Sequence, residues 1–167
     1  MSSTFRFYQT YGTTPTDVAQ GTGNGSNDWD FKSAATPGCA GAAEAIRAGD
    51  YSAHVYLKGR FDGTFSQVAN VRFWATDLSA LPSYGAGAFV LASGTATYVP
   101  PSTASMSGVW QAVPTARAQG LDVGTAGLAS GLPGYTNYVA LQLKTGVSGV
   151  VTGTAPYLYF ALGWDEV

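Results

Sequence analysis

The chain is short of charged residues, of cysteine and of histidine, and each shortage excludes a class of protein. Charged residues make up 11% of its 167 residues, against about 25% in an average soluble protein. A lone cysteine, Cys39, excludes an intrachain disulfide framework and a cysteine-rich zinc site; we expect it to be a small buried or half-buried residue. A lone histidine, His54, excludes a metal site built from histidines.

Clustered positive charge and long apolar runs are missing as well. The eight lysines and arginines are scattered, with none adjacent, and the net charge is −2. Binding to nucleic-acid phosphates requires a basic footprint that this pattern does not supply. No window approaches about 18 consecutive apolar residues, and the first ten residues lack the basic and apolar regions of a secretory signal. We therefore expect neither a nucleic-acid nor a membrane partner, and folding in the compartment of synthesis.

The chain is instead rich in apolar and aromatic residues, at 46% and 13%. The charged residues are too few to cover the surface of a lone monomer. This suggests that copies of the chain or a partner cover part of its surface. The alternative is a soluble monomer with a surface of serine, threonine and glycine.

Alternation of large and small or polar residues, the period of a β-strand, recurs along the chain. It is clearest in Pro156–Val167, whose large apolar row is Leu158, Phe160, Leu162 and Trp164. The other expected strands are Thr4–Gln9, Asp28–Lys32, Tyr51–Phe61, Phe65–Thr76, Gly87–Ala92, Thr95–Val99, Met106–Val113 and Asn137–Lys144. Eight or nine short strands predict an all-β fold, a single antiparallel β-sandwich or jelly roll with an N-terminal arm and long loops.

Turn residues divide these strands. The composition of Gly12–Asn27 favours a loop without regular structure, and Ala40–Ala48 is the one stretch compatible with a helix. Asp62-Gly63 predicts a hairpin between the strands that flank it, because a type I′ turn needs two residues with positive φ. We expect residues 1–27 to form a strand or arm and a Gly-rich loop, and residues 28–167 to form the sandwich.

The sequence offers little catalytic equipment. His54 alternates with Tyr56, Lys58 and Arg60 in a row that we expect on the solvent-facing side of a sheet. A general base needs a positioned partner, and a hydrolytic triad needs a nucleophile and an orienting group. We therefore expect no enzyme activity, no catalytic residue and no cofactor.

Paired carboxylates are the remaining candidates for chemistry. Asp28 and Asp30 would share one face of a strand, and Asn24, Ser26 and Asn27 precede them. Such oxygen ligands suit a calcium ion, whereas the simpler interpretation is a solvated strand edge. A glycoside hydrolase that uses the two acids is a third alternative, which we do not favour.

Three other features have simpler interpretations than a site. Asp165-Glu166 fits a charged cap that keeps the last strand from pairing with other chains. Gly21–Gly25 lacks the strand and helix that surround a phosphate-binding loop, so we expect a flexible loop. For the four tryptophans we favour a role in anchoring the core over stacking on sugar rings. They are Trp29, Trp74, Trp110 and Trp164.

Five segments resemble one group of proteins. They are Ile46–Ser52, Gly63–Phe65, Asn70–Trp74, Gly134–Leu143 and Trp164–Glu166. In their order they resemble small β-sandwich virion structural proteins of tailed bacteriophages, the capsid decoration or head-accessory proteins. The resemblance implies a non-enzymatic, stabilising role in the virion for a protein made in the host cytoplasm. It also implies contact with the major capsid protein or another virion protein.

Local threefold positions of a capsid favour a homo-oligomer, and a trimer above all. For partner contact we favour the aromatic side chains of the N-terminal segment Ser2–Tyr11, which are Phe5, Phe7, Tyr8 and Tyr11. The alternative is that Phe5 and Phe7 complete the core. The second functional hypothesis is a carbohydrate-binding module or receptor-binding domain of a tail fibre or secreted enzyme. It requires at least two tryptophans or tyrosines exposed on one face or groove.

Overall fold

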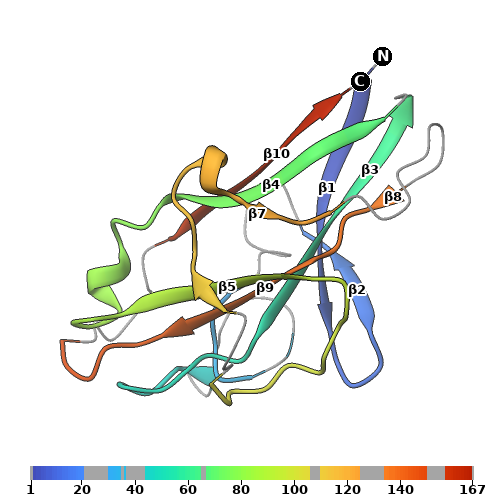
Figure 1. Ribbon diagram of the computed structural model, residues 1–167. Helices are drawn as coiled ribbons and strands as arrows, with labels where there is room; N and C mark the ends of the chain where they lie inside the picture. The colour runs from blue at the N-terminus through green and yellow to red at the C-terminus, as the bar shows by residue number, and fades with distance from the viewer. Residues whose placement is uncertain are drawn as a thin grey trace.

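Two antiparallel β-sheets make up the fold of the computed structural model (Figure 1). The structure describes residues 2–20, 30–34, 36, 44–64, 67–105, 110–124, 134–149 and 157–166. Its strands are β1 (Ser2–Tyr11), β2 (Thr16–Ala19), β3 (Val55–Thr64), β4 (Val68–Asp77), β5 (Phe89–Thr95), β6 (Gln111–Ala112), β7 (Leu121–Asp122), β8 (Gly134–Tyr135), β9 (Tyr138–Lys144) and β10 (Tyr159–Glu166). Two single-turn 3₁₀ helices are η2 (Leu81–Ser83) and η3 (Arg117–Gln119). The prediction of an all-β sandwich is confirmed.

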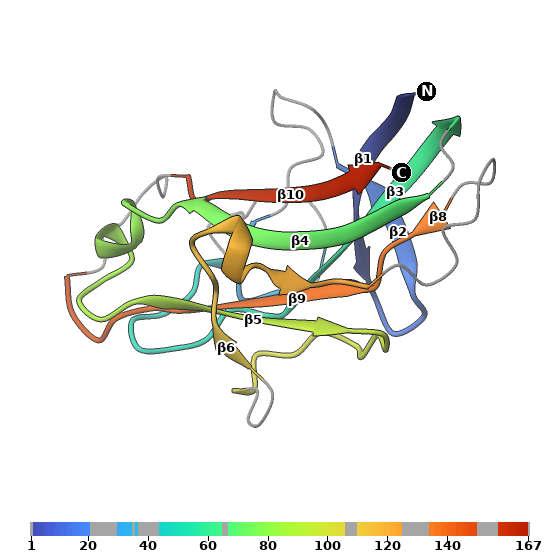
Figure 2. The same cartoon turned by 45° about the horizontal axis from the view of Figure 1, so that its top comes forward.

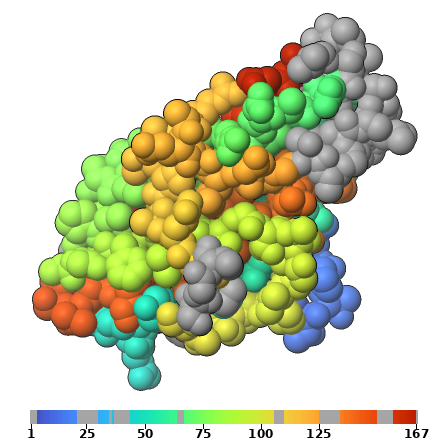
Figure 3. Space-filling model, viewed as in Figure 1, coloured from blue at the N-terminus to red at the C-terminus, as the bar shows by residue number. Residues whose placement is uncertain are grey.

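The larger sheet has the strand order β2-β1-β3-β9-β5-β6, with β8 also beside β3, and the smaller sheet has the order β10-β4-β7. Figure 2 shows β10 and β4 in one layer above β9 and β5 in the other. The chain changes sheet repeatedly, and residues 110–124 pass from β6 in the larger sheet to β7 in the smaller one. Figure 3 shows this segment, in gold, crossing the surface between β5 and β4.

The expected hairpin at Asp62-Gly63 does not form. Gly63 has the positive φ of 105° that the turn signal indicates, but β3 and β4 lie in different sheets. The edges of β3 are occupied by β1 on one side and by β8 and β9 on the other. Asp62 and Gly63 instead lie within β3 and pair with Thr4 and Ser3 of β1. β4, in the other layer, begins at Val68, and both strands turn an apolar row to the core.

The segment expected as an arm and loop is part of the larger sheet. β1 lies between β2 and β3 and pairs with β3 from Ser2 to Thr10. The prediction of an irregular loop is wrong at Thr16–Ala19, which forms β2 and pairs with β1. Their pairing is reinforced where Thr10 Oγ1 donates to Asp17 Oδ1 at 2.6 Å. Residues 21–27 lie outside the described residues.

Several expected elements are shorter or absent in the described part of the chain. Beyond Thr95 the chain leaves the sheet, so Thr95–Val99 is not a strand of its own. Residues 30–32 of the expected strand Asp28–Lys32 are not in strand conformation, and residues 44–48 form no α-helix. Of the described residues 110–113 in the expected strand Met106–Val113, Gln111–Ala112 are assigned to a strand. An alternating pattern alone does not supply the neighbouring strand that pairing requires.

The hydrophobic core lies between the sheets. It consists of Val55, Leu57, Phe61, Val68, Val71, Phe73, Ala75, Val90, Ala92, Val113, Val123, Val139, Leu141 and Leu143. Alternate residues of β3, β4 and β9 supply most of it, as the period of two requires. The apolar row of β10 packs against this core, as predicted, and so do Phe5 and Phe7 of β1. Phe61 is fully buried, with ring centroids 5.1 Å from Phe5 and 5.0 Å from Trp164.

Candidate functional site

The outer side of the larger sheet carries the row that begins at His54. The sequence predicted this row to face solvent, and that prediction is wrong for its first half, since His54 is 4% and Tyr56 1% exposed. Residues 98–105 leave the end of β5 and cover them. The amide of His54 donates to the Ser102 carbonyl at 3.1 Å, and the Tyr98 ring lies 5.0 Å from the Tyr56 ring.

His54 fastens this covering segment through both ring nitrogens. Nε2 contacts the Ala104 carbonyl oxygen at 3.1 Å, and the Ser102 amide donates to Nδ1 at 3.5 Å. This pattern fits a neutral ring protonated on Nε2. Burial lowers the pKa of His54 from its usual 6.5, although the bond to Ala104 opposes the shift. The described contacts give His54 a structural role in holding the segment on the sheet.

Further along the same side, five tyrosines form what we call the tyrosine face. They are Tyr8, Tyr56, Tyr98, Tyr135 and Tyr138. Centroid distances of 5.0–6.0 Å join Tyr56, Tyr98 and Tyr138 in one group and Tyr8 and Tyr135 in another. The carbohydrate-binding hypothesis requires at least two tryptophans or tyrosines exposed on one face or groove. This face is a candidate for that requirement, because Tyr8, Tyr135 and Tyr138 are all half-buried and therefore partly open to solvent.

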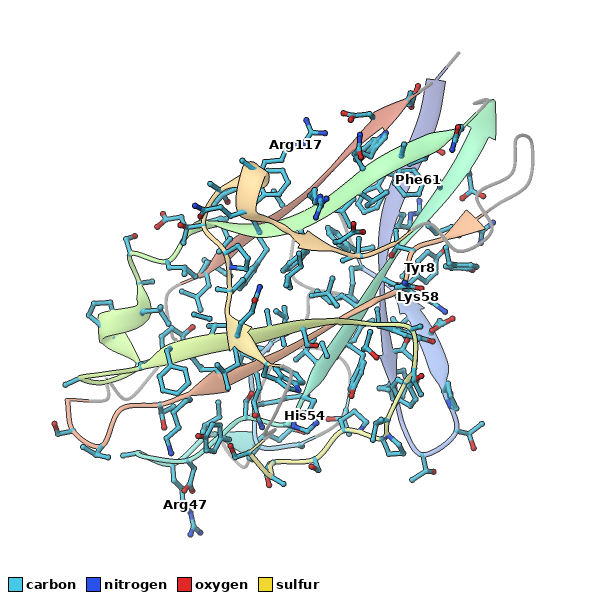
Figure 4. All side chains as sticks on the ribbon, in the orientation of Figure 1. Tyr8, Arg47, His54, Lys58, Phe61 and Arg117 are labelled. Carbon is cyan, nitrogen blue, oxygen red and sulfur yellow. The ribbon has the colours of Figure 1, made fainter. Side chains whose placement is uncertain are left out.

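Lys58 connects the two groups of tyrosines. Its Nζ lies 4.4 Å from the Tyr135 ring centroid and 5.4 Å from that of Tyr138, distances typical of cation–π contacts. It also pairs with Asp17 Oδ2 at 2.7 Å. Burial opposes the charge, but the hydrogen bond and negative charge of Asp17 outweigh it, so the pKa of Lys58 is raised. Figure 4 shows Tyr8 and Lys58 together beside β1 and β3.

Arginines continue the row at the end of the tyrosine face. Arg60 binds Asp62 Oδ1 through Nε at 3.0 Å and Nη2 at 2.9 Å. Arg6 of β1 stands directly opposite Arg60 in the strand register. A hollow of about 250 Å³ lies here over β1 and β3. The outer face therefore combines aromatic rings, cations and the carboxylates of Asp17 and Asp62, with a small depression at its Arg60 end.

The residues expected at a partner contact divide between two environments. Phe5 and Phe7 pack against the core, which is the alternative that the sequence left open for them. Tyr8 belongs to the tyrosine face, and Tyr11 is half-buried at the end of β1. Contact of any of the four with a partner stays a prediction.

A second candidate surface, which was not among the sites predicted from the sequence, lies along β10. Tyr157 is 72% and Tyr159 55% exposed, with ring centroids 6.4 Å apart. They follow from the period of two, because the opposite residues Leu158 and Phe160 face the core. In the described part of the chain β10 pairs with β4 alone, so no described strand pairs with its other edge, which we call open in that sense. We call Tyr157, Tyr159 and this open edge the β10 edge.

At the far end of β10, Asp165 is tied into the fold as well as charged. It accepts from Asn70 Nδ2 and Arg117 Nη2, each at 2.7 Å. Those two bonds lower the pKa of Asp165. Asn70 reaches it because β4 bulges there, with a φ of 51° at Asn70 and a shift in the β4–β10 register. Asp165 is thus both part of the charged end of the strand and bonded to Asn70 and Arg117.

The tryptophans have different roles. Trp164 packs against the core, as predicted. Trp110 lies 5.6 Å from the ring of His54. Trp74 is half-buried beside Gly163, where an added Cβ would stand 2.9 Å from its ring. Trp29 lies outside the described residues.

The remaining sequence candidates are mostly outside the described residues. These are Asp28, Cys39 and Gly21–Gly25, so the calcium alternative at Asp28 and Asp30 stays untested. Within the described residues no group of three or more His, Cys, Asp or Glu could hold a metal ion. No helix among them is long and apolar enough to cross a membrane.

Comparison with known proteins gives no match to a family model, to a curated protein or to a solved structure. The role that the phage-like segments imply therefore stays a prediction.

Proposed function

We propose that this protein is a structural subunit of a virion, a capsid decoration or stabilising protein that works by association and not by catalysis. In this proposal it binds copies of itself and the major capsid protein or another virion protein. A trimer is the favoured assembly, since local threefold positions on a capsid are numerous and equivalent.

The observation that carries the proposal is the β10 edge. An open strand edge presents unpaired backbone donors and acceptors to any second strand, and native proteins usually protect such edges with charge, proline or a covering element. Asp165 and Glu166 supply such charge at the C-terminal end of β10. The N-terminal end instead carries two strongly exposed tyrosines, Tyr157 and Tyr159, so the contact surface is the tyrosine end. Tyrosine is enriched at interfaces because its ring buries a large apolar area while its hydroxyl keeps a hydrogen bond. The edge thus has the composition of a contact surface.

Two sequence properties support the same conclusion. Charged residues are only 11% of the chain, and contact surfaces are depleted of charge at their centre. The phage-like segments include Trp164–Glu166, the end of β10. Association through this edge would extend the smaller sheet from one subunit to the next, a recognised mode of strand addition.

The test is the native mass of the full chain by light scattering, for the wild type and for the double variant Tyr157→Ser, Tyr159→Ser. We expect an oligomer for the wild type and a shift toward monomer for the variant. Val147→Ser is the matched control, because Val147 is 80% exposed and lies outside β10. It should leave the mass unchanged.

The virion part of the proposal needs a second measurement. We expect the chain to sediment with phage particles in a density gradient of a lysate from cells that carry its gene, and the double variant to be lost from that fraction. A wild-type chain that stays monomeric at high concentration and stays out of the particle fraction would refute the proposal.

A further inference from the structure

The hollow at the end of the tyrosine face contains an unbalanced positive charge. It is about 250 Å³ in volume and is lined by Thr4, Phe5, Arg6, Tyr8, Arg60 and Asp62. Arg6 and Arg60 stand opposite each other on neighbouring strands, an arrangement that is destabilising for like charges without a counter-charge. Asp62 supplies one for Arg60. Arg6 is exposed and forms no ion pair in the described part of the chain.

Lys58, the neighbouring cation, does not change the excess of positive charge at Arg6. Lys58 is paired with Asp17 at 2.7 Å, so the two carboxylates Asp17 and Asp62 are each committed to a different cation. Arg6 is the third cation of the group and the one without an acid. In a chain whose net charge is −2, this local excess of positive charge favours the binding of an anionic ligand.

The residues that line the hollow limit the chemical class of anion that would fit it. A guanidinium matches a carboxylate with two parallel hydrogen bonds, and the two arginines come from opposed strands with fixed register. Tyr8 adds a ring surface, backed by Tyr135 at 6.0 Å. Both bonds from Arg60 end on Asp62 Oδ1, so Asp62 Oδ2 adds an acceptor, and a ligand that is only an anion has no donor for it. A ligand that carries a carboxylate, several hydroxyls and a ring with an apolar face satisfies all three.

We infer that this hollow binds a carboxylated sugar, one uronate-type unit of an acidic glycan. Arg6 and Arg60 donate to its carboxylate, Asp62 accepts from a hydroxyl, and the ring lies against Tyr8. The volume is slightly below the range of about 300–1,000 Å³ that is typical of sites for drug-sized ligands. It therefore suits a single sugar ring, with the rest of the glycan outside.

This inference does not rest on the proposed function. The hollow is on the larger sheet, over β1 and β3, whereas the β10 edge belongs to the smaller sheet. The double variant at Tyr157 and Tyr159 should bind the sugar as the wild type does, so failure of one proposal leaves the other intact.

The test is calorimetric titration of the full chain at low salt with a short oligomer of glucuronic acid. A glucose oligomer of equal length is the neutral control ligand. We expect binding of the acidic oligomer alone, and a loss of affinity of about tenfold or more in Arg6→Gln, the size typical of a lost hydrogen bond to a charged group. Arg47→Gln is the matched control, since it removes the same charge from another exposed arginine. Figure 4 shows Arg47 at one end of the molecule, well away from Tyr8 and Lys58.

Arg6→Lys separates the planar fork from charge alone, and its affinity should fall between those of the wild type and Arg6→Gln. A urea midpoint of Arg6→Gln equal to or above that of the wild type would show that the fold is intact, since the substitution relieves the repulsion between Arg6 and Arg60. Three results would overturn the inference: no binding of the acidic oligomer, equal binding of the neutral one, or full affinity in Arg6→Gln.

Discussion

Substitution of Gly59 by alanine tests how the N-terminal strand uses its aromatic side chains. Gly59 is buried in the middle of β3, opposite Phe7 in the register. A Cβ added there would stand 2.4 Å from Cε2 and 3.1 Å from Cζ of Phe5, and 3.3 Å from Cγ2 of Thr136. The absence of a side chain at Gly59 is thus what allows the Phe5 ring to lie against the core.

Two opposing effects decide whether Gly59→Ala raises or lowers the free energy of unfolding. Glycine in a strand interior is destabilising by roughly 0.5–1 kcal/mol relative to alanine, so the substitution gains that amount. Overpacking of a core by one methyl group costs about 1–3 kcal/mol. The Phe5 ring cannot easily move, because it contacts Phe7 at 4.8 Å, Phe61 at 5.1 Å and Trp164 at 5.2 Å. We therefore expect a net loss of about 1–2 kcal/mol in the free energy of unfolding.

The assay is urea unfolding, followed by tryptophan fluorescence, with thermal unfolding alongside. For a chain of this size the expected loss lowers Tm by roughly 2–8 °C. Phe5→Leu is the second variant, because it removes the ring atoms that the new methyl group would meet. In that background Gly59→Ala should cost at least about 1 kcal/mol less, a coupling of the size seen for residues in contact.

Neutral or raised stability of Gly59→Ala in the wild-type background would refute the reasoning. It would mean that Phe5 does not lie against Gly59 in solution. The prediction made from the sequence, in which Phe5 contacts a partner, would then gain support over the alternative that Phe5 completes the core.

Two further predictions concern the segment that covers His54. Because burial lowers the pKa of His54 below its usual 6.5, the unfolded chain binds the proton first as the pH falls, and the folded state loses stability below about pH 6.5. His54→Gln should lack this part of the acid sensitivity, seen as a smaller difference between urea midpoints at pH 8 and pH 5; an equal difference in both proteins would contradict it. Gln142→Leu removes the bonds from Nε2 to the Ser52 and Ala104 carbonyls, both 3.0 Å. It should cost about 1–3 kcal/mol in urea unfolding because the buried Ser52 carbonyl loses this donor, whereas the Ala104 carbonyl keeps His54 Nε2. A change near zero would show that water replaces the amide there.

Much of the secondary structure followed from the sequence. The alternation in Pro156–Val167 correctly predicted β10 and which of its residues face the core. The same pattern located the main part of β1, β3, β4 and β9. The reason is local: a strand sends successive side chains to opposite faces, so a row of large apolar residues at a spacing of two identifies both the element and its buried side.

The sequence was a poor guide to what covers a sheet face. The row from His54 to Arg60 looks uniformly polar, yet residues 98–105 bury its first half and leave Arg60 half-buried beside a hollow. Nothing in the row itself distinguishes the two halves. The covering segment is distant in sequence and is held by backbone bonds to His54, which no local pattern encodes.

Strand pairing was decided by the tertiary structure alone. Asp62-Gly63 sets a positive φ, but the hydrogen bonds that β3 makes go to β1, β8 and β9, not to the strand that follows it. The same pairing places Arg6 opposite Arg60 and leaves the β10 edge open. The sequence by itself determined where the long strands β1, β3, β4, β9 and β10 form and which side of each carries its large apolar row, because both depend on neighbours along the chain. Both candidate surfaces depend on which distant strands pair and in what register, and only the folded sandwich determines that.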